Sequence, residues 1–140
     1  MDNWADRYAS VLEGLNARNL QSLDDVLDLN VDFRDPFNHT TSRDLFKRLL
    51  EDMYAKLDHV EFKVKQVLSD KEQGMILWTF SGESRLTGNV NFDGMSRLLA
   101  NEQGMVIAHH DYWDGSALMA NLPVAGPFVR FLRKKLRYRD

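Results

Sequence analysis

The chain has 140 residues, of which 44% are hydrophobic, a net charge of −3 and no cysteine. A single domain of this size buries roughly two-thirds of the surface that its unfolded chain exposes, so a core with room for a cavity is expected. The lack of cysteine excludes disulfides, thiolate nucleophiles and cysteine-based zinc sites. The N-terminus has no apolar signal segment and no stretch is long enough to span a bilayer, so we expect a soluble, cytoplasmic protein that forms one domain over residues 1–140.

Charge is distributed unevenly along the chain. Six cations fall within residues 130–139, and without them and the terminal Asp140 the sequence holds 12 basic and 20 acidic residues, a balance of −8. Such a basic tail could contact anionic lipid or nucleic acid. We favour the simpler interpretation, a solvated helix face whose cations lie near the helix C-terminus, where the helix dipole stabilises positive charge. We therefore expect no nucleic-acid partner and keep membrane contact through this tail as the weaker alternative.

Three helices are predicted in the first 58 residues. Apolar side chains recur every three or four residues in segments that begin near Trp4, Leu20 and Thr41, and the second segment continues to Leu27. Thr41 with Asp44 resembles a capping box. The apolar stripe of the third helix consists of Leu45, Leu49, Leu50, Met53, Tyr54 and Leu57.

The remaining pattern is mostly that of strands. Residues 31–38, "VDFRDPFN", alternate until Pro36, and from His59 the period is again two. Residues 74–82 are apolar on both faces, as in a central strand, and residues 88–100 form a long strand in which Gly94 is the expected place for a bulge or bend. Helices followed by hairpin-connected strands predict an α+β domain, with helices packed on one face of a curved, mostly antiparallel sheet.

A short amphipathic helix is predicted near the C-terminus. Phe128, Phe131, Leu132 and Leu136 recur at helical spacing within residues 123–140. The connection before them contains two prolines and a glycine and could fold back over one end of the sheet as a lid. We favour a plain helix that covers the core.

The segment "VDFRDPFN" offers a first candidate for chemistry. Alternation places Phe33 and Asp35 on one face and Asp32 and Arg34 on the other. A carboxylate on an apolar face must be hydrogen-bonded, paired or protonated, because isolated burial of its charge costs several kcal/mol. Asp35 is therefore a candidate general base, or else it ends the strand and bonds the following turn. Both interpretations stay open.

The segment "MVIAHHDYWDG", residues 105–115, offers a second group of candidate residues for chemistry. An apolar residue, two ionisable groups and an indole are typical of the wall of a small-molecule pocket, and one face of this strand combines them. Because side chains two apart on a strand lean alongside each other, the Asp111 carboxylate can hold a His109 imidazolium. The alternative is a buried pair with a structural role. The predicted pocket face consists of Ile107, His109, Asp111 and Trp113, and the opposite face of Ala108, His110, Tyr112 and Asp114.

No cofactor or metal is expected. His109 and His110 point in opposite directions on a strand, so they cannot ligate the same ion. The sequence also lacks Gly-x-Gly-x-x-Gly, a phosphate loop and Gly-x-Ser-x-Gly.

Two long segments resemble the SnoaL-like branch of the nuclear transport factor 2-like superfamily. They are "LNARNLQSLDDVLDLNVDFRDPF" and "FDGMSRLLANEQGMVIAHHDYWD", residues 15–37 and 92–114. That branch is related to ketosteroid isomerase, limonene epoxide hydrolase and polyketide cyclases. The resemblance implies a cone-shaped barrel over residues 1–122, a pocket between the curved sheet and the helices, and commonly a homodimer, with residues 123–140 as the basic C-terminal helix.

The resemblance also suggests roles for single residues. Asp35 falls where ketosteroid isomerase has its proton-abstracting Asp, and that enzyme's oxyanion-hole donors fall on Val11 and Ser96. Val11 cannot donate a hydrogen bond, which argues against steroid isomerisation by that mechanism. The positions that line the family's pocket fall on the face of His109 and Asp111.

Comparison with the polyketide cyclases and the epoxide hydrolases suggests other roles, which concern Asp111 and Arg97. Polyketide cyclases use one pocket Asp for an intramolecular aldol step, and Asp111 matches it best, with His109 to orient it or to stabilise an enolate. Epoxide hydrolases need an Asp-Arg-Asp arrangement, and alternation turns Arg97 away from Ser96.

The leading hypothesis is a cofactor-independent enzyme that transfers a proton next to a carbonyl of a small apolar molecule, as an isomerase or an aldol cyclase. Asp111 and Asp35 are the candidate bases and His109 their partner. Alternatives are a non-catalytic small-molecule-binding or assembly module, and water addition of the epoxide-hydrolase type. The expected substrate-binding wall consists of Trp113, Ser96, Phe33, Val11 and Trp78.

Overall fold

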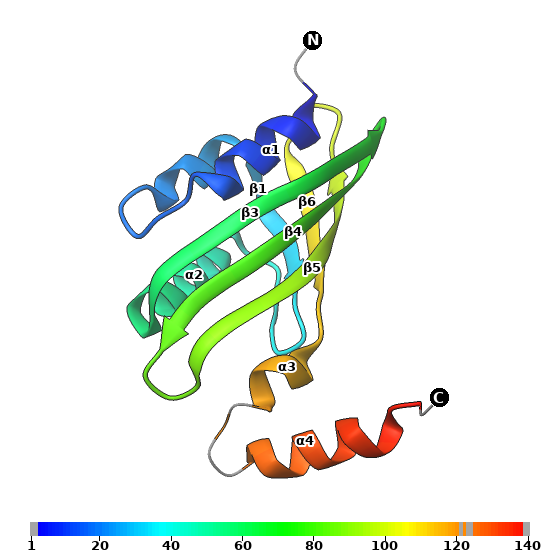
Figure 1. Cartoon of the computed structure of the whole chain (residues 1–140). Coiled ribbons are helices and arrows are strands. Elements are labelled where there is room, and N and C mark those ends of the chain that lie inside the picture. Colours follow the sequence, from blue (N-terminus) through cyan, green and yellow to red (C-terminus); the bar gives the residue numbers. More distant parts are fainter. Residues whose placement is uncertain (1–2, 121, 123–124, 139–140) are drawn as a thin grey trace.

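The computed structural model describes residues 3–120, 122 and 125–138, and its body is a six-stranded sheet that curves around two helices (Figure 1). Neighbouring strands are antiparallel except β1 and β6, which are parallel. The predicted α+β class with a mostly antiparallel sheet is therefore confirmed. The strands are β1 (Leu27–Arg34), β2 (His39–Thr40), β3 (Leu57–Asp70), β4 (Gln73–Ser84), β5 (Gly88–Ala100) and β6 (Val106–Tyr112), in the spatial order β2-β1-β6-β5-β4-β3.

The helices lie before and after the long strands in sequence. α1 (Trp4–Glu13) and α2 (Arg43–Lys56) pack against the sheet, and the 3₁₀ helix η1 (Leu20–Asp25) follows α1. α3 (Gly115–Met119) and α4 (Ala125–Leu136) come after β6. Asn3 caps the N-terminus of α1, since its side chain accepts a hydrogen bond from Ala5 N at 2.8 Å. The fully buried side chains between these layers include Tyr8, Leu23, Leu27, Val31, Ile76, Ser96, Leu98 and Val106.

The helix boundaries differ from the prediction at three places. Leu27, expected in the second helix, begins β1, and Leu57, expected in the third helix, begins β3. The cap of α2 is Ser42 rather than Thr41, and its hydroxyl accepts from Leu45 N at 3.3 Å. Leu45 is 44% exposed, whereas Phe46 is buried because its ring stacks on Phe33 with centroids 4.2 Å apart. Leu49 and Leu50 of the predicted stripe do pack against the core. The contact with Phe33, which is far away in sequence, explains why Phe46 rather than Leu45 completes the inward side.

Gly94 does not mark a bulge. The β4–β5 ladder runs without a register shift, and Gly94 pairs directly with Trp78. A Cβ on Gly94 would lie only 2.8 Å from Trp78 Cζ3, so the missing side chain makes room for the indole. A close approach of a ring, and not a bend, explains this glycine.

The bulge lies in β6 instead. Leu99 pairs with Ala108 while Ala100 pairs with Val106, so Ile107 has no partner on β5. Ile107 is consequently 37% exposed, and its predicted place on the face of His109 is wrong. After the bulge the alternation resumes as predicted.

α4 does not cover the core. Gly126 and Val129 are its buried residues, whereas Phe128 and Phe131 are 63% and 54% exposed. Figure 1 shows α4 beside α3, beyond the end of the sheet. The prediction of a core-covering helix is therefore wrong, and residues 123–124, which include Pro123, and residues 139–140 of the predicted segment lie outside the described residues. None of the described helices has the length and hydropathy to cross a membrane.

Candidate functional site

A buried histidine and its neighbouring aspartate form the centre of the candidate site. His109 is 4% exposed, and its Nε2 lies 2.6 Å from Oδ1 of Asp111. The Tyr8 hydroxyl of α1 lies 2.6 Å from His109 Nδ1 on the other side of the ring. Phe33 and Phe46 pack edge to face on the imidazole, with centroids 5.3 and 5.6 Å away. The pair expected from alternation is therefore formed, in aromatic surroundings.

Ser96 and Trp78 extend this network across the sheet. The Ser96 hydroxyl donates to Asp111 Oδ1 at 2.5 Å, and Trp78 Nε1 donates to the Ser96 oxygen at 2.8 Å. Ser96 and Asp111 are direct partners in the β5–β6 ladder, which brings their side chains to the same face. The network thus connects α1, β6, β5 and β4.

The hydrogen-bond donors and acceptors of the network determine which atoms carry its protons. Burial, and then the negative charge of Asp111, raise the pKa of Tyr8 well above its ordinary value, so the phenol keeps its proton. The single hydroxyl hydrogen of Ser96 is used on Asp111, and an indole N–H can only donate. Every proton has an acceptor when His109 is neutral, with Nε2–H donated to Asp111 and Nδ1 accepting from Tyr8.

Asp111 is the most exposed residue of this hydrogen-bond network. Its side chain is 17% exposed, compared with 5% for that of His109. Both hydrogen bonds to its carboxylate end on Oδ1, and no described residue donates to Oδ2. The described residues therefore leave the hydrogen-bonding capacity of Oδ2 unused.

The predicted wall residues are only partly assembled here. Trp113 stacks on Phe92 with ring centroids 4.4 Å apart and meets Phe37 edge to face at 5.6 Å. Phe33 and Trp78 contact the network as described, whereas Val11 packs on the core from α1 without a polar contact. Most of the predicted wall residues are thus aromatic and pack on other aromatic rings.

Asp35 lies outside the network. Its Oδ1 accepts from the backbone N–H groups of Phe37 and Asn38 at 2.8 and 2.7 Å, and its own N–H donates to Asn38 O at 3.0 Å. No hydrogen bond between described residues joins Asp35 to His109 or Asp111. Its carboxylate shapes the β1–β2 turn, which was the structural alternative for this residue.

Tyr8 was missing from the candidates. The resemblance placed the isomerase's hydroxyl donor on Val11, whereas the residue of α1 whose hydroxyl bonds His109 is Tyr8, one turn earlier. A tyrosine within the apolar stripe of a helix needs a partner for its hydroxyl, and this signal could have identified it.

The opposite face of the strands carries a separate polar cluster. His110 lies 2.9 Å and His39 3.2 Å from the Asp32 carboxylate, and Arg34 donates to it at 3.0 Å. Burial disfavours the charged form of Asp32, but these three hydrogen bonds outweigh it and hold its pKa at about 2. Within the described residues no three or more ligating side chains are placed to hold a metal ion.

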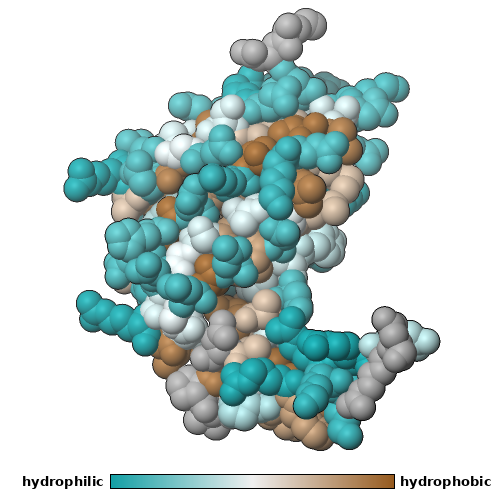
Figure 2. Space-filling model, viewed as in Figure 1, coloured by the Kyte–Doolittle hydropathy of each residue, from teal (hydrophilic) through white to brown (hydrophobic). Residues whose placement is uncertain are grey.

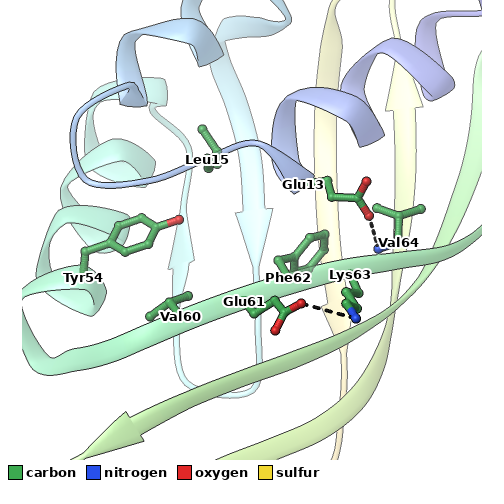
Figure 3. Close-up of a pocket in the computed structure, with 8 residues that line it drawn as sticks. All are labelled: Glu13, Leu15, Tyr54, Val60, Glu61, Phe62, Lys63 and Val64. Carbon is green, nitrogen blue, oxygen red and sulfur yellow. Dashed lines mark hydrogen bonds and ion pairs between the residues drawn. The ribbon is translucent and has the colours of Figure 1, made fainter.

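A surface hollow of about 390 Å³ lies elsewhere, between the end of α1, α2 and β3 (Figure 3). Glu13 accepts from Val64 N at 2.7 Å beside it, and Phe62 packs on Trp78 with centroids 5.1 Å apart. The hollow therefore adjoins the aromatic core without including the His109–Asp111 network. Its lining residues are Glu13, Leu15, Tyr54, Val60, Glu61, Phe62, Lys63 and Val64.

Comparison with known proteins identifies the fold. The sequence profile of the SnoaL-like domain matches residues 8–109. A comparison with curated proteins finds no match. A SnoaL-like polyketide cyclase from Agrobacterium tumefaciens str. C58 superposes with a TM-score of 0.71 at 18% identity, covering 84% of this chain and 95% of that one.

Two further solved structures share the fold. A protein with a ketosteroid isomerase-like fold from Catenulispora acidiphila DSM 44928, crystallised with trimethylamine, gives a TM-score of 0.71 at 13% identity over 85% of this chain and 91% of that chain. TsrD from Streptomyces laurentii gives 0.73 at 14% identity, over 88% and 98%. These similarities support the cone-shaped architecture expected from the sequence.

Proposed function

The chain belongs to the SnoaL-like family, and on this premise we propose that it is a cofactor-independent enzyme that transfers a proton next to a carbonyl of a small apolar substrate. The observation that supports this proposal best is the Asp111 carboxylate, whose Oδ1 is held by His109 and Ser96 while Oδ2 has no partner among the described residues. A positioned carboxylate with one oxygen open is the arrangement that general acid–base catalysis needs.

In the proposed reaction, Oδ2 of Asp111 takes a proton from the carbon next to the carbonyl, which leaves an enolate. Where the substrate has a C=C bond conjugated with this enolate, Asp111 then returns the proton to the far carbon of that C=C bond and the double bond shifts next to the carbonyl, in an isomerisation. Alternatively, the enolate carbon bonds to a second carbonyl carbon of the same molecule, and the new alkoxide takes the proton, in an aldol cyclisation. His109 and Tyr8 act as positioning residues, since they fix the carboxylate through one chain of hydrogen bonds.

We assign the base to Asp111 rather than to Asp35, because the β1–β2 turn uses both oxygens of the Asp35 carboxylate: Oδ1 accepts from the N–H groups of Phe37 and Asn38, and Oδ2 accepts from the Asn38 side chain at 3.2 Å. Water addition of the epoxide-hydrolase type has less support. Arg97 is exposed on β5 and pairs in register with His110, and among the described residues no arginine bonds Asp111.

A non-catalytic binding module is the second candidate. It rests on the hollow of Figure 3, which has room for a small molecule and lies apart from Asp111. A neighbour of the same fold was crystallised with trimethylamine, so the fold can hold a small ligand. The homodimer implied by the resemblance also stays a proposal, which light scattering after gel filtration can test.

Proton exchange tests the enzyme proposal without knowledge of the product. A panel of small ketones and diketones is incubated with the protein in D₂O, and loss of the protons next to the carbonyl is followed by NMR. We expect Asp111→Asn to slow the exchange by about 10²- to 10⁴-fold, the usual contribution of a general base. Asp93→Asn, which alters an exposed carboxylate on β5, is the matched control.

Two results would contradict the proposal. Equal exchange rates for the wild-type and Asp111→Asn proteins would remove Asp111 from the chemistry. No acceleration by either protein, together with a co-purifying ligand found in both by native mass spectrometry, would favour the binding module.

A further inference from the structure

α4 carries two stripes of opposite character. Its exposed apolar side chains include Phe128, Phe131, Leu132 and Leu136, which are 63%, 54%, 41% and 85% exposed. Arg130, Arg133, Lys134 and Arg137 recur at the same helical spacing on the other side of the axis. Figure 2 shows hydrophilic side chains on the side of α4 in view and hydrophobic ones along its lower edge.

The rest of the described chain leaves the apolar stripe uncovered and contacts only part of the cationic stripe. α4 packs on α3 through Gly126 and Val129, where a Cβ on Gly126 would lie 2.6 Å from the Ala120 oxygen. Arg130 donates to that same oxygen, and Arg133 lies 3.8 Å from Asp114. The cations near the end of α4, Lys134, Lys135 and Arg137, pair with no acidic side chain in the part of the chain that the structure describes.

We propose that α4 docks the protein on the surface of an anionic phospholipid bilayer. A helix with aromatic and leucine side chains on one face and cations on the other lies in the bilayer interface, with its apolar face among the acyl chains and its cations at the headgroups. Lys135 follows Phe131 by four residues and so lies on the apolar side of α4, with its ammonium 5.7 Å from the centre of the Phe131 ring. Its long side chain can extend from there to the headgroups.

The charge distribution of the whole chain favours the same orientation. Residues 125–139 contain six cations and no acid, whereas the residues outside the basic tail carry a balance of −8. An anionic surface attracts the basic segment and repels the acidic rest of the chain, so α4 faces the bilayer and the body of the protein faces away. In Figure 1 α4 lies at one end of the molecule, where it can reach a flat surface before the sheet does.

Other occupants fit these stripes less well. Pairing of α4 with α4 of a second copy would cover the apolar stripes, but it would bring together two segments that each carry six cations and no acid, residues 125–139 of each copy. Nucleic acid would neutralise the cations but would leave the apolar stripe in water. An anionic bilayer satisfies both stripes at once.

Vesicle sedimentation with the full chain tests the proposal. We expect binding to vesicles of phosphatidylcholine with phosphatidylglycerol, weakened by salt, and little binding to phosphatidylcholine alone. Each cation near such a surface is worth about fivefold in partitioning, so Lys134→Gln, Lys135→Gln and Arg137→Gln together should lower binding about a hundredfold. Phe131→Ser with Leu136→Ser should also lower it strongly, since these side chains enter the interface.

Matched variants on the body serve as controls. Arg18→Gln, Arg48→Gln and Arg85→Gln remove the same charge from exposed positions, and Leu68→Ser with Leu86→Ser alters side chains that are 57% and 64% exposed. Binding should survive both, and circular dichroism checks that every variant folds.

Four results would overturn the proposal. The first is that the wild-type protein binds no vesicle, and the second that it binds neutral and anionic vesicles equally. The third is a loss of binding in the body variants equal to that in the α4 variants. The fourth is that the protein does not bind vesicles and instead shows another partner. That partner would be a second copy, if Phe131→Ser with Leu136→Ser turns a dimer into a monomer, or nucleic acid, if the chain binds duplex DNA.

Discussion

Gly94→Ala should destabilise the protein through the Trp78 ring. The added Cβ would lie 2.5 Å from Cζ2 and 2.8 Å from Cζ3, with Cη2 nearer still, whereas real Cβ contacts are essentially never below 3.0 Å. Trp78 is 3% exposed and lies between Phe62 and Phe92, with centroids 5.1 and 6.0 Å away, so it has little room to retreat. Any shift also weakens the 2.8 Å hydrogen bond from its indole to Ser96.

These two effects set the magnitude. Overpacking of this kind costs about 1–3 kcal/mol and a lost hydrogen bond about 1 kcal/mol, so the free energy of unfolding should fall by about 2–4 kcal/mol. For a chain of this length that lowers Tm by roughly 10 °C. Thermal unfolding followed by circular dichroism measures it directly.

Gly82→Ala is the matched control on the neighbouring strand. A Cβ there meets the Asp58 oxygen and the side chains of Leu57 and Val60 at 3.6 Å, which is ordinary van der Waals contact, so Tm should stay nearly unchanged. Trp78→Phe, which has a smaller ring, should recover part of the loss when combined with Gly94→Ala. If both glycine variants melt at the same temperature, the packing argument for Gly94 is wrong.

Three further predictions concern polar contacts. Tyr8→Phe leaves the buried Nδ1 of His109 without a donor and should cost about 1–3 kcal/mol in urea unfolding; Tyr112→Phe, at a 62% exposed position, should cost nothing, and equal stabilities would show that the Tyr8 bond does not matter. The pKa of Asp32 is lowered from 3.8 to about 2, so its contribution to stability is complete above about pH 4 and is lost as the pH falls through about 2. Asp32→Asn should therefore be less stable than wild type at neutral pH, with the difference in Tm closing in acid; a difference independent of pH would refute this. Asp35→Asn keeps the turn acceptor and should preserve both stability and proton exchange, whereas Asp35→Ala should lose about 1 kcal/mol. Collapse of exchange in a folded Asp35→Asn protein would instead identify Asp35 as a base.

Strand alternation by itself determined much of the site. A period of two is imposed by the backbone, so the shared face of His109, Asp111 and Trp113 and the opposite direction of His110 followed from their spacing alone. The same alternation placed Asp32 and Phe33 on opposite faces of their strand. The order of helices and strands was similarly local, and it predicted the α+β class correctly.

Only the tertiary structure decided which distant residues complete these local patterns. Tyr8 reaches His109 across 101 positions of sequence, and Gly94 is explained only by the Trp78 ring on the next strand. The apolar stripe of α4 would have the same spacing against a core or in a bilayer, because periodicity records that a face avoids water and not what covers it. Contacts between distant segments depend on the packing of the whole chain, and for that reason the exposure of α4 could not be predicted from its own residues.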